Sequence, residues 1–144
     1  EPYEGRHAPD TSIPLVLMEP HHVDEPTRKV YEDIKATLTL PFVNTDYRAF
    51  ARWPSYFALA WSDLRGKVGK PAHEAICQAV HDRAAKLAAD GLPNPGGLSA
   101  EALRRAASAD AGLEEILQVC RLFQWLIPGL IVNVAYFRHQ LEAV

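Results

Sequence analysis

A single carboxylate stands among aromatic side chains near the middle of the chain. Asp46 follows Thr45, and the aromatic residues Tyr47, Phe50 and Trp53 come soon after it in the sequence. Apolar neighbours raise the pKa of a carboxylate, and such a group can take a proton from an attacking water. Asp46 is therefore a candidate general base. Residue types alone favour another interpretation, in which Thr45 or Asp46 caps the helix that starts here, because a short oxygen-bearing side chain satisfies free backbone N–H groups.

A second group of side chains has the spacing of metal ligands. His73, Cys77 and His81 are each four residues apart, which places them on one face of a helix. The segment from His73 to Cys77 resembles the zinc-protease pattern His-Glu-x-x-His but has Cys in the last place, and Cys on an apolar helix is usually a small core residue. We expect no metal site here.

Other motifs of catalysis are missing from the sequence. It contains no Gly-x-Gly-x-x-Gly, P-loop, Gly-x-Ser-x-Gly or Cys-x-x-Cys pattern. Near the C-terminal end, Phe123, Trp125, Tyr136 and Phe137 are most simply core residues. Asn133 lies among them and, if buried, must bond a neighbouring helix or line a small polar cavity.

The elements that position these residues all have helical periodicity. No run of alternating polarity has the length of a strand, and no repeat occurs within the 144 residues, so we predict an all-α fold in a single compact multi-helix domain. Helices are expected over residues 24–38, 47–52, 54–66, 72–90 and 100–108, followed by 111–126 and 128–142 as one kinked helix or two.

Two details of the later helices can be checked against a structure. The helix over 72–90 should turn a stripe toward the core and end at Gly91 as its C-cap; the stripe consists of Ile76, Ala79, Val80, Ala84 and Leu87. The apolar run from Leu122 to Phe137 is expected to be a buried helix pair that is too short to span a bilayer.

The organisation expected along the chain is an arm followed by a helical domain. Residues 1–22 carry spaced prolines and no helical period, which favours an extended arm, and residues 23–144 form the domain. The start has no initiator Met and no signal-peptide pattern, so a fragment or processed piece of a longer protein is expected.

Composition excludes some classes of function. The net charge is -3 without a dense basic block, so nucleic acid is not expected as a partner. Cys77 and Cys120 lie far apart in helical patterns, which favours thiols in a reducing, cytoplasmic compartment. We expect a soluble chain with no membrane partner.

One stretch resembles a known family. Asp33 to Leu38, Leu40 to Arg48 and Arg52-Trp53-Pro54 are similar to the group I 2-haloacid dehalogenases, a family that accepts both enantiomers of short 2-halocarboxylic acids. The resemblance runs from the Pro-Tyr-Glu-Gly start to the C-terminus. It implies an all-helical fold of two related halves about a pseudo-twofold axis, of which this chain looks like the second half, preceded by the linker.

The resemblance also implies a reaction and a site. Asp46 matches the aspartate that activates a water to displace halide directly from C2, with inversion and no covalent intermediate. Thr45 matches a small hydroxyl residue beside the substrate, and Phe137 with Phe123 resembles the aromatic wall around it. No metal or organic cofactor is implied. The implied substrate is a 2-haloacid, and the base interpretation of Asp46 becomes the stronger one.

The chain departs from the family in length, since only one half is present. The resemblance therefore implies a partner: another half-domain or a second copy of this chain, as a dimer. Two rival hypotheses remain open. One is a non-catalytic helical pairing module in which Asp46 caps a helix and residues 111–142 dimerise. The other is an alkylhydroperoxidase-like helical protein, which the missing Cys-x-x-Cys pattern disfavours.

Overall fold

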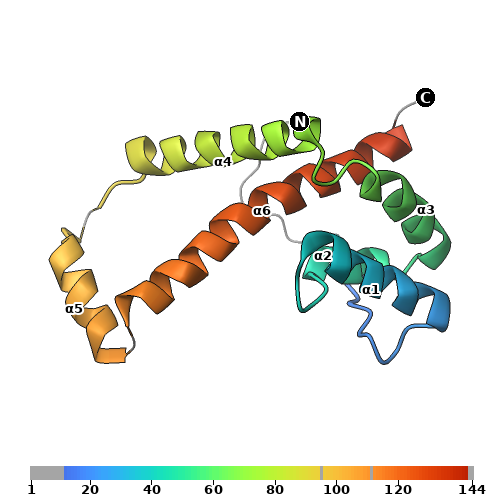
Figure 1. The fold of residues 1–144 in the computed structure, drawn as a ribbon, viewed down its shortest axis with the longest axis horizontal. Coiled ribbons are helices and arrows are strands. Elements are labelled where there is room, and N and C mark those ends of the chain that lie inside the picture. Colours follow the sequence, from blue (N-terminus) through green and yellow to red (C-terminus); the bar gives the residue numbers. More distant parts are fainter. Residues whose placement is uncertain (1–11, 95, 111, 143–144) are drawn as a thin grey trace. The chain divides into compact units, whose positions relative to one another are not determined.

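The computed structural model describes residues 12–94, 96–110 and 112–142, and these residues contain helices and no strand. The prediction of an all-α fold is confirmed. The six helices are α1 (Glu25–Leu38), α2 (Thr45–Phe50), α3 (Pro54–Arg65), α4 (Pro71–Gly91), α5 (Ala100–Asp110) and α6 (Leu113–Glu142). Within the domain, contacts group into two compact units, Glu1–Val68 and Gly69–Val144 (Figure 1).

Local sequence signals set the ends of the first helices. The N-cap of α1 is Asp24, whose Oδ1 accepts a hydrogen bond of 2.9 Å from the backbone N–H of Thr27, with Pro26 in the first turn. The C-cap, Thr39, has a φ of 56°, the left-handed conformation that costs a β-branched residue energy. Pro54 then opens α3, as its sequence predicts.

The core of the first unit forms between α1, α2 and α3. Its fully buried side chains come from all three helices: Tyr31, Ile34, Tyr47, Phe57 and Leu64. One polar connection joins α1 to α3, because Asp33 accepts a hydrogen bond of 2.7 Å from Trp61 Nε1 and pairs with Arg65 at 3.0 Å. α1 and α3 are thus fixed to each other by apolar packing and by a shared carboxylate.

The described part of the arm is held by its backbone. The N–H of Met18 donates to the carbonyl of Arg48 over 3.0 Å, and the Tyr31 hydroxyl donates to the carbonyl of Met18 over 2.7 Å. The Arg52 guanidinium reaches the carbonyl of Pro14 at 2.8 Å. Of the arm expected over residues 1–22, residues 14–19 have no regular secondary structure and are attached to α1 and α2, whereas residues 20–22 form a turn. The prediction for residues 1–11 lies outside the described residues.

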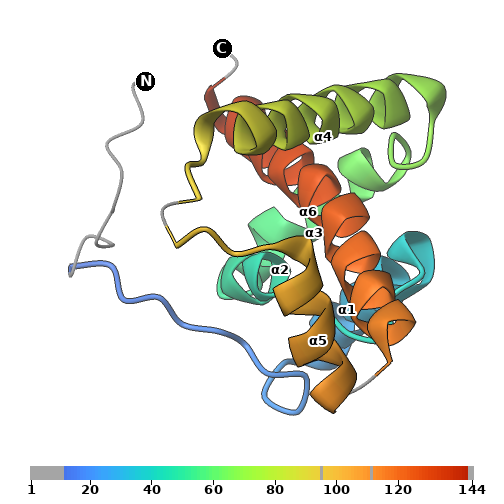
Figure 2. The same ribbon diagram turned by 90° about the vertical axis from the view of Figure 1, so that its left-hand side faces the viewer.

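The second unit consists of α4, α5 and α6, with α4 and α5 both packed on α6 (Figure 2). Ser99 caps α5 as predicted, because its Oγ accepts from the N–H of Ala102 over 3.1 Å. Residues 113–142 form one continuous helix that includes Pro128, so of the two alternatives for this region the single helix is correct.

Three expectations about this unit are wrong. α4 has no buried residue, with Ile76 53% and Leu87 51% exposed, because neither α5 nor α6 covers its apolar stripe within the second unit. Gly91 lies inside α4, whose C-cap is the extended Leu92. α6 is not a buried helix pair, since only Pro128, Asn133 and Phe137 are buried in it.

α6 also has the length and apolar composition of a membrane-crossing helix, with a mean hydropathy of 1.4 in its most apolar window. The apolar run from Leu122 to Phe137, which was expected to be too short to span a bilayer, is thus part of a longer apolar helix. An apolar helix that binds other helices passes the same test, so this property assigns α6 no membrane role.

Candidate functional site

The candidate base stands at the start of a short, well-anchored helix. Asn44 has extended backbone angles and occupies the N-cap of α2, so Asp46 lies in the first turn. One position further along, Tyr47 is fully buried, with ring centroids 5.7 Å from Trp61 and 6.4 Å from Phe57 of α3. Because Tyr47 fixes α2 on α3, the neighbouring Asp46 is carried on a rigid support.

The carboxyl group of Asp46 is partly removed from water. The residue is half-buried, and its Oδ2 is buried without a hydrogen-bond partner among the described residues. Burial raises the pKa of Asp46, while the backbone N–H groups of Asp46 and Tyr47 at the helix start act in the opposite direction. A carboxylate with a raised pKa and a free oxygen has the two properties that a general base needs.

The capping interpretation is wrong in its simple form. Neither Thr45 nor Asp46 is the N-cap of α2, because Asn44 holds that position and makes no side-chain capping bond. Helix-start N–H groups still interact with the Asp46 carboxyl, but burial is the larger influence on its pKa. The side chain at 46 is therefore dominated by desolvation rather than by capping.

The other predicted site residues are distributed over both units. Thr45 is exposed beside Asp46 in the first unit. Phe137 and Phe123 lie on α6 in the second unit, where Phe137 is fully buried and Phe123 is 47% exposed. The two phenylalanines are 14 positions apart on one helix, which separates them by about 21 Å along its axis. A short haloacid is smaller than that distance, so at most one of them can line its site.

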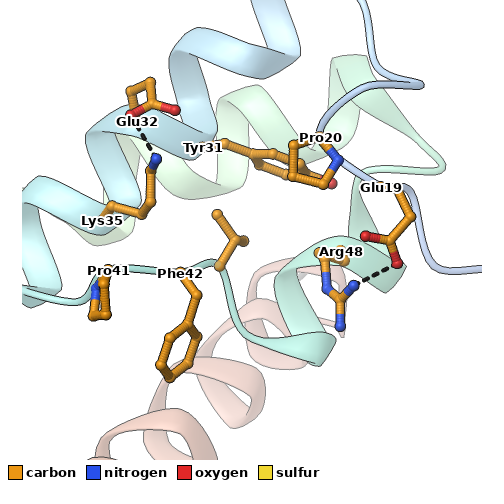
Figure 3. Close-up of a pocket in the computed structure, with 9 residues that line it drawn as sticks. Glu19, Pro20, Tyr31, Glu32, Lys35, Pro41, Phe42 and Arg48 are labelled. Atoms are coloured by element: carbon orange, nitrogen blue, oxygen red, sulfur yellow. Dashed lines mark hydrogen bonds and ion pairs between the residues drawn. The ribbon is translucent and has the colours of Figure 1, made fainter.

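One pocket within the first unit does not contain the candidate base. It has a volume of about 390 Å³ and lies between the arm, α1 and α2, and neither Asp46 nor Thr45 lines it (Figure 3). Its two cations are neutralised, since Arg48 pairs with Glu19 and Lys35 pairs with Glu32 at 2.7 Å. The pocket therefore offers no unpaired positive charge to the carboxylate of a small acid.

Sequence reasoning missed the residues that attach the arm next to Asp46. The Arg48 side chain bonds Glu19, and desolvation raises the pKa of Tyr31 to about 12, so its hydroxyl remains a donor to the arm. Glu19 and Arg48 are 29 positions apart, and no local pattern connects them. Only the charge types at these positions could have suggested a pair.

The face with metal-ligand spacing is used to join α4 to α6. Nε2 of His73 lies 2.9 Å from Oδ1 of Asn133, and Nε2 of His81 lies 2.8 Å from the Gln124 amide nitrogen. The His81 ring also stacks on Trp125, with centroids 5.2 Å apart. No group of three ligating side chains is close enough for a metal within the described ranges.

Two earlier alternatives about this face are now decided. Asn133 is buried and bonds a neighbouring helix, the first of the two roles expected for a buried amide. Cys77 sits 3.6 Å from Nδ1 of His73, and burial, helped by Glu74, raises the pKa of its thiol. A thiol held in its neutral form is a packing group rather than a nucleophile.

Comparison with known proteins points to one class of enzyme. No protein-family model matches the chain. An (R)-2-haloacid dehalogenase of Pseudomonas putida is 42% identical over 125 residues, which are 87% of this chain and 41% of that protein. An (R)-2-haloacid dehalogenase of Rhizobium sp. (strain NHG3) is 52% identical over 90 residues, which are 62% of this chain and 35% of that protein.

Solved structures give the same result for the fold. A crystal structure of a D-2-haloacid dehalogenase mutant superposes with a TM-score of 0.69 at 39% identity, covering 88% of this chain and 43% of the other. A complex of D-2-haloacid dehalogenase with L-LA superposes equally well at 40% identity. This chain thus spans less than half the length of the relatives it matches. Over most of its own length, the chain is related to one part of a 2-haloacid dehalogenase.

Proposed function

We propose that this chain is the Asp46-bearing half of a hydrolytic 2-haloacid dehalogenase. The observation that carries the proposal is the state of Asp46, which is half-buried, has one oxygen without a partner among the described residues, and has a raised pKa. The similarity to (R)-2-haloacid dehalogenases supports the class of substrate. As an enzyme, the protein would be a hydrolase acting on carbon–halide bonds.

The proposed reaction is a direct displacement. Asp46 accepts a proton from a water while the oxygen of that water attacks C2. The new C–O bond forms on the face opposite the halide, and the C–X bond breaks with its electron pair leaving on the halide. The products are the 2-hydroxy acid of inverted configuration, halide, and a protonated Asp46 that later releases its proton. Desolvation helps because it makes the carboxylate a stronger base.

The residues around the substrate form a second part of the proposal. We place Thr45 beside the substrate because it adjoins Asp46 and its side chain is exposed. Phe123 and Phe137 both remain aromatic candidates, but only one of them can adjoin a small acid, since they lie 14 positions apart on the same helix. We assign the positive charge that holds the substrate carboxylate to another half-domain or a second copy, because Arg48 and Lys35 of the first-unit pocket are paired.

Stereochemistry separates two forms of this proposal. The resemblance of residues 33–54 is to a family that accepts both enantiomers, whereas the matched relatives are named for the (R) configuration. We propose (R)-2-haloacids as substrates. Chloride release should be measured with (R)- and (S)-2-chloropropionate separately. Release from the (R) enantiomer alone supports this choice, and equal rates would show that the enzyme accepts both enantiomers.

Isotope labelling tests the mechanism itself. A single turnover in H₂¹⁸O should place the label in the hydroxy acid and none in the protein. Label in the Asp46 carboxyl would instead show a covalent ester and refute direct attack by water. The chain should be assayed alone and mixed with the part of the Pseudomonas putida relative that it does not match, because in this proposal a second half-domain or a second copy completes the site.

A non-catalytic pairing module remains the second candidate. The large exposed apolar side chains of α6, such as Leu122, Trp125 and Ile131, favour it, because such surface marks a site of association. Both candidates predict association. Only the dehalogenase predicts halide release that depends on Asp46.

A further inference from the structure

The arm is attached to the short helix α2 and to the residues directly after it. The backbone N–H of Met18 donates to the carbonyl of Arg48 in α2 over 3.0 Å. The carboxylate of Glu19 pairs with the guanidinium of Arg48 (Figure 3). Beyond the end of α2, the side chain of Arg52 reaches the carbonyl of Pro14 at 2.8 Å. The arm thus holds α2 through two backbone carbonyls and one ion pair.

α2 needs such support because it is short. A helix of six residues makes few internal hydrogen bonds and is not stable by itself, and its last carbonyl groups have no partner within the helix. The N–H of Met18 supplies a donor to one of them, at Arg48. The carbonyl of Met18 in turn accepts a hydrogen bond of 2.7 Å from the hydroxyl of the buried Tyr31 in α1. The arm therefore joins the end of α2 to α1.

The ion pair lies on the side of α2 away from Asp46. At 100° per residue, Arg48 is about 160° around the helix from Asp46, and Tyr47 lies between them and packs on α3. The arm holds one side of α2, the core holds the middle, and Asp46 stands on the remaining side. Because α2 is a single turn and a half, any tilt allowed by a weaker attachment at Arg48 also moves the carboxyl group of Asp46.

Placement explains the Glu19–Arg48 ion pair better than net stability does. The side chains are 41% and 23% exposed, and Nε of Arg48 is buried without a hydrogen-bond partner among the described residues. A buried donor without a partner costs free energy, which offsets part of what the ion pair contributes. An ion pair with this balance adds little to the free energy of unfolding, but it favours one arrangement of the segments that it joins.

We propose that Glu19 and Arg48 are positioning residues, whose ion pair fixes α2 so that the carboxyl group of Asp46 keeps its place. The inference deepens the proposed function and rests on it, because small displacements of a base from its water lower the rate of reaction. Both residues act through α2 and not by contact with the substrate. The effect of the ion pair on Asp46 is measured without substrate, so it is tested separately from the reaction.

Arg48→Met separates placement from direct electrostatics by the sign of one shift. Burial is the largest cause of the raised pKa of Asp46, so a loosened α2 should admit water to the carboxyl group and lower that pKa. Loss of a nearby positive charge by itself would raise the pKa of Asp46 instead. In an NMR titration of the carboxyl carbon, we expect the pKa to fall in Arg48→Met. It should stay near the parent value in Arg48→Lys, which can still pair with Glu19.

Hydrogen exchange measures the attachment of α2 itself. In Arg48→Met, the backbone N–H groups of α2 should exchange roughly threefold to tenfold faster, the range for loss of a partly exposed ion pair or a charge-assisted hydrogen bond. Those of α1 and α3 should keep their rates, because the opening is local. The matched control is Arg28→Met, since Arg28 pairs with Glu25 at 3.5 Å in α1 and the same charge is lost. It should change neither the exchange of α2 nor the pKa of Asp46.

The deciding experiment is this titration and exchange of the 144-residue chain and its three variants, followed by kinetics with the chain alone or in the mixture, whichever is active. A lower pKa and faster α2 exchange in Arg48→Met alone support the proposal. A pKa that is unchanged or raised overturns it, and so does exchange that accelerates equally in α1, α2 and α3. In turnover, Arg48→Met should lower kcat by about tenfold to a hundredfold with KM within about twofold; an unchanged kcat overturns the proposal.

The two proposals fail differently. If the pKa and the exchange respond as expected but the parent releases no halide in any assembly, the hold of the arm on Asp46 is established and the dehalogenase assignment is refuted. If the parent releases halide and Arg48→Met changes neither the pKa, the exchange nor kcat, the dehalogenase assignment stands and the positioning role of Glu19 and Arg48 is refuted.

Discussion

Replacing Asp46 by Asn should remove activity while leaving the fold at least as stable. Asn has nearly the same shape and cannot take a proton from water, so loss of the base should lower kcat by about 10²–10⁴-fold. The free energy of unfolding should stay equal or rise, because the folded protein disfavours the ionised form of Asp46 and Asn carries no charge.

The sign follows from the direction in which the pKa moves. Burial raises the folded-state pKa above the unfolded value, so ionised Asp46 costs stability, and this cost grows as the pH rises from the unfolded pKa through the folded pKa. Above both values the cost is constant. A tenfold change in the proton affinity of the carboxylate corresponds to about 1.4 kcal/mol. Asp46→Asn should therefore unfold at equal or higher urea concentration at pH 7, and the difference should vanish at acidic pH.

Two measurements and a matched control complete this test. Chloride release from (R)-2-chloropropionate measures activity, with the chain alone or in the mixture, whichever is active. Urea unfolding at pH 3 and pH 7 measures stability. Asp90→Asn is the control, because Asp90 is exposed and pairs with Lys86 on the same helix. Halide release in Asp46→Asn within a few-fold of the parent refutes the base assignment. A clear loss of stability at pH 7 refutes the reasoning from desolvation.

Further predictions concern the framework. Asn133→Ala should lower the free energy of unfolding by about 1–3 kcal/mol, because it removes the side-chain oxygen that Nε2 of His73 bonds. A double-mutant cycle with His73→Ala should show coupling between the two residues, and simple additivity would refute the bond. Tyr47→Ala should cost about 3–5 kcal/mol in urea unfolding, against little for exposed Trp53→Ala; equal losses would contradict the packing described. Thr39→Gly should raise the melting temperature, since glycine relieves about 1–2 kcal/mol of left-handed strain, and a lowered one would refute that strain.

Packing around Tyr47 explains why the candidate base was predictable and its setting was not. The sequence shows Asp46 between aromatic residues, and local rules place a helix start beside it. The sequence does not show that Asn44 takes the N-cap, that Tyr47 turns toward α3, or that Oδ2 of Asp46 becomes buried. Those facts depend on how α2 packs on α3, which no short-range pattern encodes.

The existence of the helices and several of their starts are what the sequence determined by itself. Proline at the starts of α3 and α4, Asp24 and Ser99 as caps, and the 3.6-residue period are local properties, and local hydrogen bonding decides them. Which faces are covered was decided only by tertiary structure. The stripe of α4 has the pattern of a core face, yet it is exposed, whereas His73 and His81 are typical of surface or metal-ligating positions, yet they contact α6. Periodicity identifies an apolar face but does not supply the element that buries it, because burial depends on residues distant in the chain or in another copy.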